Sequence, residues 1–324
     1  MLRTRFCDLF DVEIPVLQAP IWPAASPELV AAVAQAGAVG SLAAIFTPAD
    51  DLRRQIARVR ELTDRPFVVN HVVPNLDEDA LEATLDAGPA AVSFALGDAG
   101  DLVDRVHAAG SKVIQQVHTV AQARQAAQLG VDVVIAQGSE AGGQGMALGP
   151  SAMTLAPQVV DAVAPIPVLV AGGVADGRGL AAALVLGAAG VNVGTRFLAS
   201  DEAGVDEAWK RRVVDVESED AVRFEPWTAI MPPGPGSFDV VPRVIRTPFI
   251  DEWRRRAPDV AGQAEELRGQ IMGALRAGRA HELTPFAGQT AGLVHEVRPA
   301  GEVVRAMAAE AEEALARTLP SRAG

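Results

Sequence analysis

The repeated alternation of short apolar segments with alanine-rich segments is the feature that most constrains how this chain can fold. The apolar segments are rich in valine, isoleucine and alanine, and they lie at residues 16–21, 38–43, 67–70, 91–96, 112–117, 131–136, 168–171 and 190–194. Their apolarity is continuous rather than alternating, which is typical of parallel strands that are buried on both faces. We therefore expect eight buried parallel strands.

Helical patterns separate these predicted strands. They lie at residues 26–36, 48–62, 77–87, 100–109, 119–129, 153–163 and 176–186. Several begin after a side chain that can cap a helix, and several end at a glycine. Strand–helix units joined by right-handed crossovers predict an α/β fold, a (β/α)8 or TIM barrel.

The last barrel helix is delayed. It is predicted only at 301–319, after a Pro/Gly-rich loop at 226–236 and an amphipathic helical part at 249–280. We expect residues 1–200 and 285–324 to form the barrel, and residues 201–284 to form a smaller, mainly helical domain inserted after strand eight. An insertion there projects from the face that carries barrel active sites. It is interpreted either as a lid or substrate domain, in which Trp227, Met231 and Phe238 could line an apolar pocket, or as a homodimer interface.

Composition excludes several classes of function. The net charge of −13 argues against nucleic acid and membrane surfaces as partners, because both are anionic. The single cysteine, Cys7, excludes a disulfide framework and a multi-cysteine metal site, and no metal is expected. The first residues lack the apolar core of a secretory signal, which predicts a cytoplasmic protein. A tyrosine proton donor is impossible because the chain has no tyrosine.

Glycines end the two last predicted strands. Gly172 and Gly173 follow the seventh strand, and Gly194 and Thr195 follow the eighth. In barrels these two loops commonly bind phosphate through backbone N–H groups, and glycine allows a close approach. The sequence therefore predicts a ligand that carries a phosphate.

Six motifs along the chain together resemble the nitronate monooxygenase family, formerly 2-nitropropane dioxygenases. They lie at residues 18–21, Asn70, 137–143, 171–179, 194–197 and 288–293. The resemblance implies FMN as cofactor, oxidative denitrification of nitronates with O2 to a carbonyl compound and nitrite, and a small-molecule substrate. The FMN contacts that it implies are Ala19, Pro20, Asn70, Gln137, Gly142, Gly143, Gly172, Gly173, Asn192, Gly194 and Thr195. Related flavin enzymes reduce enoyl thioesters or quinones with NAD(P)H, which is the alternative activity.

Gln144 departs from the family pattern. The position after the two glycines is normally a histidine that is proposed as the base or as a substrate-orienting group. A glutamine amide can donate and accept hydrogen bonds but cannot usefully gain or lose a proton. We therefore expect oxidation of a preformed nitronate, or hydride transfer, rather than deprotonation of a neutral nitroalkane. Gln144 then orients the substrate.

Two histidines are candidates to replace the missing one. His71 follows Asn70, and His118 follows strand five. His71 is preferred because it adjoins a predicted flavin contact, although strand alternation points its side chain away from that of Asn70. Two further alternatives stay open: a flavin-binding barrel without catalysis of its own in a biosynthetic complex, and a flavin-free barrel enzyme acting on a sugar phosphate.

Overall fold

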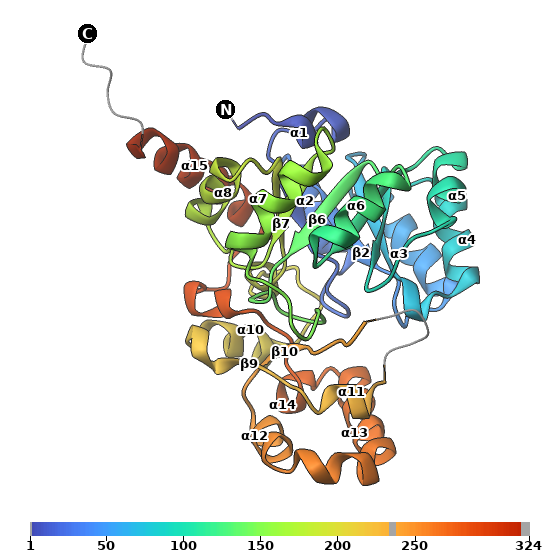
Figure 1. The fold of residues 1–324 in the computed structure, drawn as a ribbon, viewed down its shortest axis with the longest axis vertical. Helices are drawn as coiled ribbons and strands as arrows, with labels where there is room; N and C mark the ends of the chain where they lie inside the picture. The colour runs from blue at the N-terminus through green and yellow to red at the C-terminus, as the bar shows by residue number, and fades with distance from the viewer. Residues whose placement is uncertain (1, 233–237, 319–324) are drawn as a thin grey trace.

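The computed structural model describes residues 2–232 and 238–318, and its centre is a closed barrel of eight parallel strands (Figure 1). The strands are β1 (Val16–Gln18), β2 (Gly40–Ala43), β3 (Phe67–Val72), β4 (Ala91–Ala95), β5 (Lys112–Val117), β6 (Val133–Gln137), β7 (Val168–Ala171) and β8 (Gly190–Val193). From β2 to β8 each strand pairs with the next, and β8 pairs with β1, where Val16 lies opposite Val191. A parallel bridge between Leu17 and Val39 closes the circle. The predicted (β/α)8 barrel is confirmed.

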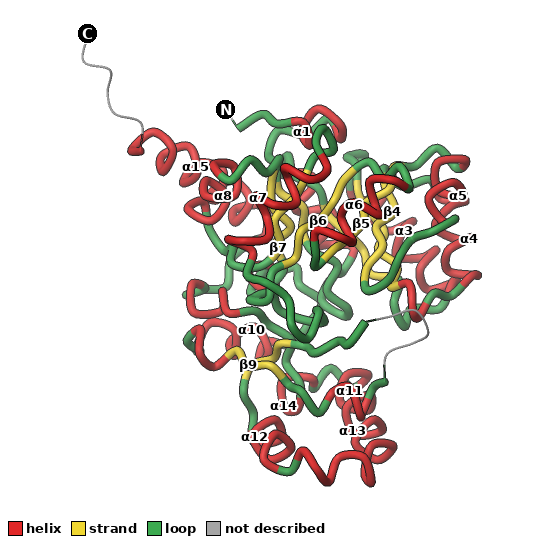
Figure 2. The backbone as a smooth tube through the Cα atoms, viewed as in Figure 1, coloured by secondary structure: helices red, strands yellow, loops and turns green. Residues whose placement is uncertain are grey.

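Helices surround the strands (Figure 2). They are α2 (Pro27–Gln35), α3 (Ala49–Leu62), α4 (Glu78–Ala87), α5 (Leu102–Ala108), α6 (Val120–Gln128), α7 (Ala152–Val163), α8 (Gly177–Val185) and the late α15 (Ala300–Thr318), with a 3₁₀ turn η1 (Val73–Asn75) after β3. Four begin as the sequence predicts, because Ser26, Asp77, Thr119 and Asp176 accept hydrogen bonds from backbone N–H groups of the first turn.

A short helix closes one end of the barrel. This helix, α1 (Arg5–Phe10), was not predicted from the sequence, and its Phe6, Cys7 and Phe10 are buried in one cluster with barrel residues such as Leu17 and Ile135. In Figure 1 α1 lies at the opposite end of the barrel from the inserted segment. Cys7 is therefore a core residue.

The segment between β8 and α15 is mainly helical, as expected. Its elements are α9 (Thr195–Leu198), α10 (Glu207–Val214), η2 (Ser218–Asp220), β9 (Ala221–Arg223), α11 (Trp227–Ile230), β10 (Arg243–Ile245), α12 (Pro248–Arg255), η3 (Ala257–Gln263), α13 (Ala264–Arg276), α14 (Ala280–Leu283) and η4 (Gln289–Leu293). The antiparallel pair β9–β10 was not predicted. The Pro/Gly-rich loop runs into 233–237, outside the described residues. The domain boundaries at 201 and 284 stay a prediction.

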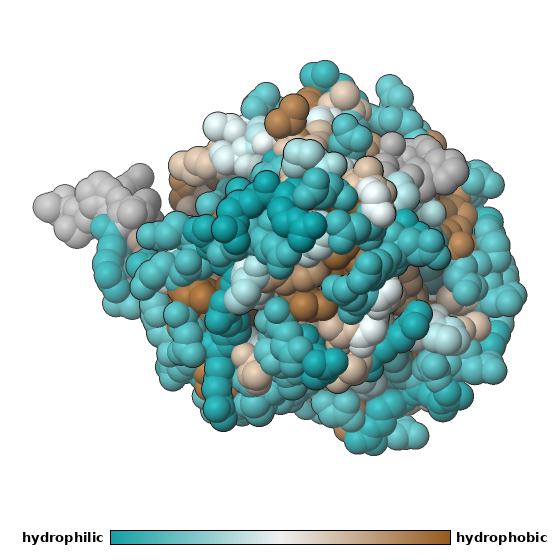
Figure 3. Space-filling model, turned by 90° about the horizontal axis from the view of Figure 1, so that it is seen from below, coloured by the Kyte–Doolittle hydropathy of each residue, from teal (hydrophilic) through white to brown (hydrophobic). Residues whose placement is uncertain are grey.

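Figure 3 shows the end of the molecule that carries the inserted segment. This face is mostly hydrophilic, with apolar side chains gathered near its centre. Among the helices formed by residues 2–232 and 238–318, none combines the length and the hydropathy that a bilayer span needs.

Candidate active site

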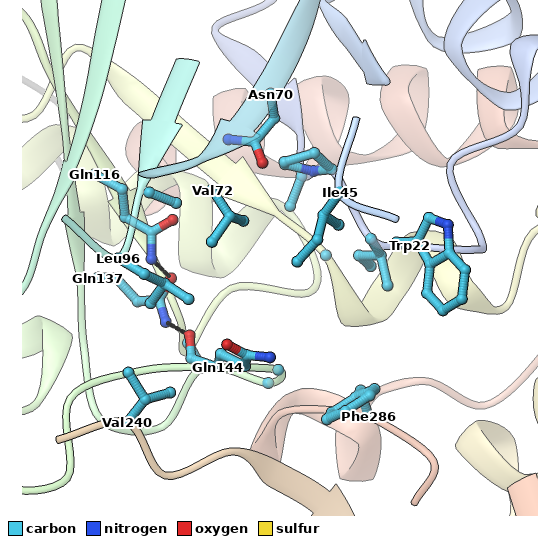
Figure 4. Close-up of a pocket in the computed structure, with 18 of the residues that line it drawn as sticks. Trp22, Ile45, Asn70, Val72, Leu96, Gln116, Gln137, Gln144, Val240 and Phe286 are labelled. Atoms are coloured by element: carbon cyan, nitrogen blue, oxygen red, sulfur yellow. Dashed lines mark hydrogen bonds between the residues drawn. The ribbon is translucent and has the colours of Figure 1, made fainter. Parts of the chain in front are cut away.

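A cavity of about 460 Å³ lies between the carboxyl ends of the strands and the inserted segment (Figure 4). A cavity of this size and position is typical of a small-molecule site. The barrel contributes Ala19, Pro20, Ile21, Trp22, Ile45, Phe46, Asn70, Val72, Pro74, Asn75, Ala95, Leu96, Gln116, Gln137, Ala141, Gly142, Gly143, Gln144, Ala171, Gly172, Val174, Asn192, Gly194, Thr195 and Leu198. The later part of the chain contributes Trp227, Met231, Pro232, Val240, Arg268, Met272, Leu275, Phe286, Ala287 and Thr290.

Three glutamines form one side of the cavity. The Gln116 amide nitrogen donates to Gln137 Oε1, and Gln137 Nε2 donates to the backbone oxygen of Gln144 at 3.0 Å (Figure 4). Gln116 and Gln137 come from the ends of neighbouring strands, β5 and β6. The chain of amides holds the backbone of residue 144 at the cavity, while the Gln144 side chain takes no part in it.

Two asparagines supply further amides. Asn70 Nδ2 donates to the oxygen of Ser93 at 3.2 Å and to Ser93 Oγ at 2.9 Å, which fixes the plane of its amide. Asn192 is buried, and its Oδ1 has no hydrogen-bond partner among the described residues. A buried acceptor that lacks a partner carries a desolvation penalty. This atom therefore points to a ligand that donates a hydrogen bond.

Glycines let the loops after β6, β7 and β8 pack closely. A Cβ atom on Gly142 would overlap the backbone nitrogen of Gly288, in the segment after α14. Gly172 and Gly173 have φ of +91° and +76°, which favour glycine. Gly194 precedes α9, and the Thr195 hydroxyl accepts a hydrogen bond from the Gly288 N–H at 2.8 Å. The segment after α14 is thus tied directly to the end of β8.

Charge is nearly absent from the cavity wall. Arg268 is the only ionisable residue in the described lining, which has no Asp, Glu, His, Lys or Cys. Its Nε donates to the Ile230 oxygen at 2.8 Å. Across the described ranges, no group of three or more His, Cys, Asp or Glu is placed to hold a metal ion. The wall can donate and accept hydrogen bonds, but it offers no general base near neutral pH.

The sequence model of the family described as nitronate monooxygenase matches residues 3–84 and 77–310. The chain belongs to the nitronate monooxygenase family. Members of this family are flavin-dependent oxidoreductases. The resemblance noted in the sequence is confirmed.

Solved structures support the membership. FabK from Thermotoga maritima matches with a TM-score of 0.88 and 33% identity over 98% of each chain. A nitroalkane oxidase from Streptomyces ansochromogenes matches with a TM-score of 0.82 and 30% identity, over 97% of this chain and 99% of that chain. Both likenesses include the inserted segment.

A relative in Mycobacterium tuberculosis is 44% identical over 215 residues. It is named (3aS,4S,5R,7aS)-5-hydroxy-7a-methyl-1-oxo-octahydro-1H-indene-4-carboxyl-CoA dehydrogenase. The aligned part covers 65% of this chain, and the chain spans 60% of the length of that relative.

The residues expected to contact cofactor or substrate gather at one site, with two exceptions. Those that line the cavity are Ala19, Pro20, Asn70, Gln137, Gly142, Gly143, Gln144, Gly172, Asn192, Gly194 and Thr195. Gly173 is not part of the lining, because it turns toward the Glu140 side chain: a Cβ there would lie 3.3 Å from Glu140 Oε1. His71 is the other exception.

His71 lies outside the described cavity. Its side chain is 2% exposed, and Nε2 lies 2.9 Å from Thr84 Oγ1 on α4. Burial lowers the pKa of His71 to about 4. The alternation of side chains along β3 sends Asn70 into the barrel and His71 out toward the helices. This placement corrects the expectation that His71 lies in the site, because its side chain cannot reach an occupant of the described cavity.

His118 lies behind the glutamines rather than on the cavity wall. It is 2% exposed, its Nε2 is 3.5 Å from Gln116 Nε2, and its ring meets that of Phe238 edge-on with centroids 5.0 Å apart. Burial, and secondarily the charge of Arg223, lower the pKa of His118 to about 4. Neither histidine lies on the described cavity wall.

Sequence reasoning missed several cavity residues. They include Gln116, Trp22, Phe46, Leu96, Phe286 and Arg268. Gln116 had a visible signal, because it is a polar residue inside an apolar strand whose register alternates with Gln115. Trp22, Phe46 and Phe286 lie in loops, where no periodic pattern assigns a direction to a side chain. Leu96 ends a predicted strand and Arg268 lies in α13, and neither pattern reveals that the residue reaches the cavity. Of the insertion residues named in advance, Trp227 and Met231 line the cavity and Phe238 does not.

Proposed function

We propose that this chain is an FMN-dependent oxidoreductase of the nitronate monooxygenase type that acts on a nitronate already formed, using O2. The single observation that carries the proposal is the composition of the cavity wall. It combines amides and glycines at the ends of β3, β6, β7 and β8 with an absence of general bases from the described lining.

The residues present fit FMN. Asn70, Gln137 and Asn192 would hold the flavin ring, and the partnerless Oδ1 of Asn192 would receive an N–H donor. Gly172, Gly194 and Thr195 would hold the phosphate through backbone N–H groups. When bound, the flavin supplies the redox chemistry, and the protein supplies orientation and the exclusion of water.

The chemistry at residue 144 follows from its amide. Gln144 can donate hydrogen bonds to the oxygens of an anionic nitronate, but it cannot remove a carbon-bound proton. Arg268 adds a positive charge at the same cavity, which attracts an anion and does not accept a proton. Substrates that arrive deprotonated are therefore favoured over neutral nitroalkanes.

The test begins with the visible spectrum of the purified protein, where bound FMN is expected. O2 uptake is then measured with a nitronate and with the matching neutral nitroalkane, and only the nitronate is expected to be consumed. A protein that neither contains nor takes up FMN would overturn the proposal. A protein that binds FMN but performs neither half-reaction would instead favour a barrel without catalysis of its own.

A second candidate is an NAD(P)H-dependent flavin reductase of enoyl thioesters or quinones. The 44% identity to a relative named as a carboxyl-CoA dehydrogenase favours it. Transfer of a hydride also needs no general base, so the same cavity wall suits it. NAD(P)H oxidation with an enoyl thioester or quinone, and no O2 uptake with nitronates, would replace the first proposal by this one.

A further inference from the structure

The turn after β2 holds a phenylalanine in a backbone conformation that favours glycine. The Thr47 N–H donates to the Ala44 oxygen at 3.0 Å, which makes Phe46 the third residue of a tight turn. Phe46 has φ of +56°, inside the left-handed region. For a bulky side chain this region is strained, and glycine or asparagine is the usual occupant of such a position.

Only three non-glycine residues of the described chain have a positive φ: Asp11, Phe46 and Leu96. The positive φ of Asp11 is explained by its position, because Asp11 is the C-cap of α1 and its N–H donates to the Cys7 oxygen. Phe46 and Leu96 both line the cavity, at the ends of β2 and β4. Strained apolar residues thus occur at this cavity from two separate strands.

Packing within the protein does not account for Phe46. Its side chain is 52% exposed, and it belongs to none of the hydrophobic core clusters. Its ring meets the edge of Trp22, with centroids 5.4 Å apart and an angle of 72° between the planes. Trp22 also lines the cavity. The strained turn therefore presents the Phe46 ring to the cavity and to Trp22, which also packs against the core cluster that contains Trp227.

Trp22 of the aromatic pair lies on the side of the cavity away from Gln116 and Gln137. Figure 4 shows Trp22 and Ile45 across the cavity from Gln137, with Phe286 of the later segment nearby. An occupant that reacts near Gln144 would extend its remaining atoms toward this apolar side. Apolar area is available there for a substrate body larger than a short alkyl chain.

We propose that Phe46, together with Trp22, is a specificity-determining contact that packs against a bulky apolar body of the substrate, such as an alicyclic or aromatic ring. This inference rests on the proposed function for its turnover assay. A glycine at position 46 would relieve the backbone strain, but it would remove the apolar side chain that contacts the ring of the substrate.

The experiment compares two nitronates, those of nitrocyclohexane and nitroethane, in the FMN-loaded protein. Phe46→Gly removes the ring and relieves the backbone, so the melting temperature is expected not to fall. The ratio of kcat/KM for the cyclic over the two-carbon nitronate is expected to fall roughly tenfold, the loss that one apolar ring contact produces. Phe46→Leu keeps an apolar side chain and is expected to restore most of the ratio.

Asp11→Gly is the matched control, since it relaxes a positive-φ residue remote from the cavity. It is expected to leave both rates unchanged and the melting temperature no lower. Equal changes for the two nitronates in Phe46→Gly, or a lower melting temperature with an unchanged ratio, would overturn the inference. These results would make Phe46 a structural residue.

If neither nitronate is oxidised, the proposed function fails while the inference remains testable by binding. Neutral nitrocyclohexane and nitroethane are then titrated into the protein by calorimetry. The wild type is expected to prefer the ring, and Phe46→Gly is expected to lose that preference. Equal preference in the two proteins would overturn the inference independently of turnover.

Discussion

Gln144→His should give this cavity the base that it lacks. The backbone around residue 144 is held by contacts that do not involve its side chain. Its oxygen accepts from Gln137 Nε2 at 3.0 Å, and the flanking Gly143 exchanges hydrogen bonds with the backbone of Arg243, at 3.2 and 2.9 Å. The imidazole is therefore expected to enter the cavity without moving the loop.

The expected gain in turnover follows from the absence of a general base in the described cavity lining. Because no described lining residue of the wild type can accept a proton near neutral pH, the full effect of a positioned base is available. Such a base contributes about 10²–10⁴-fold in a proton-transfer step, or roughly 3–5 kcal/mol of barrier. Turnover of a neutral nitroalkane is expected to rise toward this range, while turnover of its nitronate changes by no more than about threefold.

The assay measures O2 uptake with nitroethane and with its nitronate across a range of pH. A histidine base works in its neutral form, so the gain with nitroethane is expected to increase as pH rises through about 6.5 and then to level off. Gln144→Asn, which also has an amide that does not titrate, is expected to show no gain. Equal gains for the nitroalkane and the nitronate would refute the reasoning.

Three further perturbations test the packing, the burial and the cofactor contacts. Gly142→Ala should lower the free energy of unfolding by about 1–3 kcal/mol in thermal melts, because its Cβ would overlap Gly288. Gly149→Ala is the control and should leave the free energy of unfolding unchanged, because its Cβ would meet no atom closer than 3.8 Å. His71 has a pKa of about 4 in the folded protein and about 6.5 in the unfolded chain, so its burial lowers the free energy of unfolding as pH falls from about 6.5 to 4. In urea unfolding, the free energy of unfolding of His71→Gln should fall by about 2 kcal/mol less than that of the wild type over this pH range. An equal fall in both proteins would contradict the burial argument. Asn192→Ala should weaken FMN binding roughly tenfold in a fluorescence titration, since it removes the partnerless acceptor, and an unchanged affinity would exclude Asn192 from the flavin site.

Local chemistry explains which site residues could be read in advance. Parallel strands end at one rim, so polar residues and glycines at those ends converge whatever the details of packing. The family resemblance implied Asn70, Gln137 and Asn192, and all three lie at or near such strand ends and line the cavity. Alternation along β3 already directed His71 away from Asn70. Direction along an extended strand is a property of the backbone, and it needs no tertiary information.

Contacts between distant segments could not be read in the same way. The sequence pattern does not reveal that Gly142 packs on Gly288, or that Arg268 and Phe286 reach the cavity from the segment after β8. The positive φ of Phe46 could not be predicted either, because its local sequence has no glycine or asparagine that would indicate a left-handed residue.

By itself, the sequence predicted the barrel and the family, and both are confirmed. Phosphate binding at the last two strand ends and the departure of Gln144 from the family pattern stay predictions. The barrel follows from periodicity and the phosphate prediction from residue chemistry, which act over a few positions, whereas the family and the Gln144 departure follow from the resemblance of the motifs. The tertiary structure decided that no base lies on the described cavity wall, that His71 and His118 are buried outside it, and that Trp22 lines it across from Gln137. The physical reason is that a cavity is enclosed by segments far apart in the chain, and its composition is fixed only when they pack.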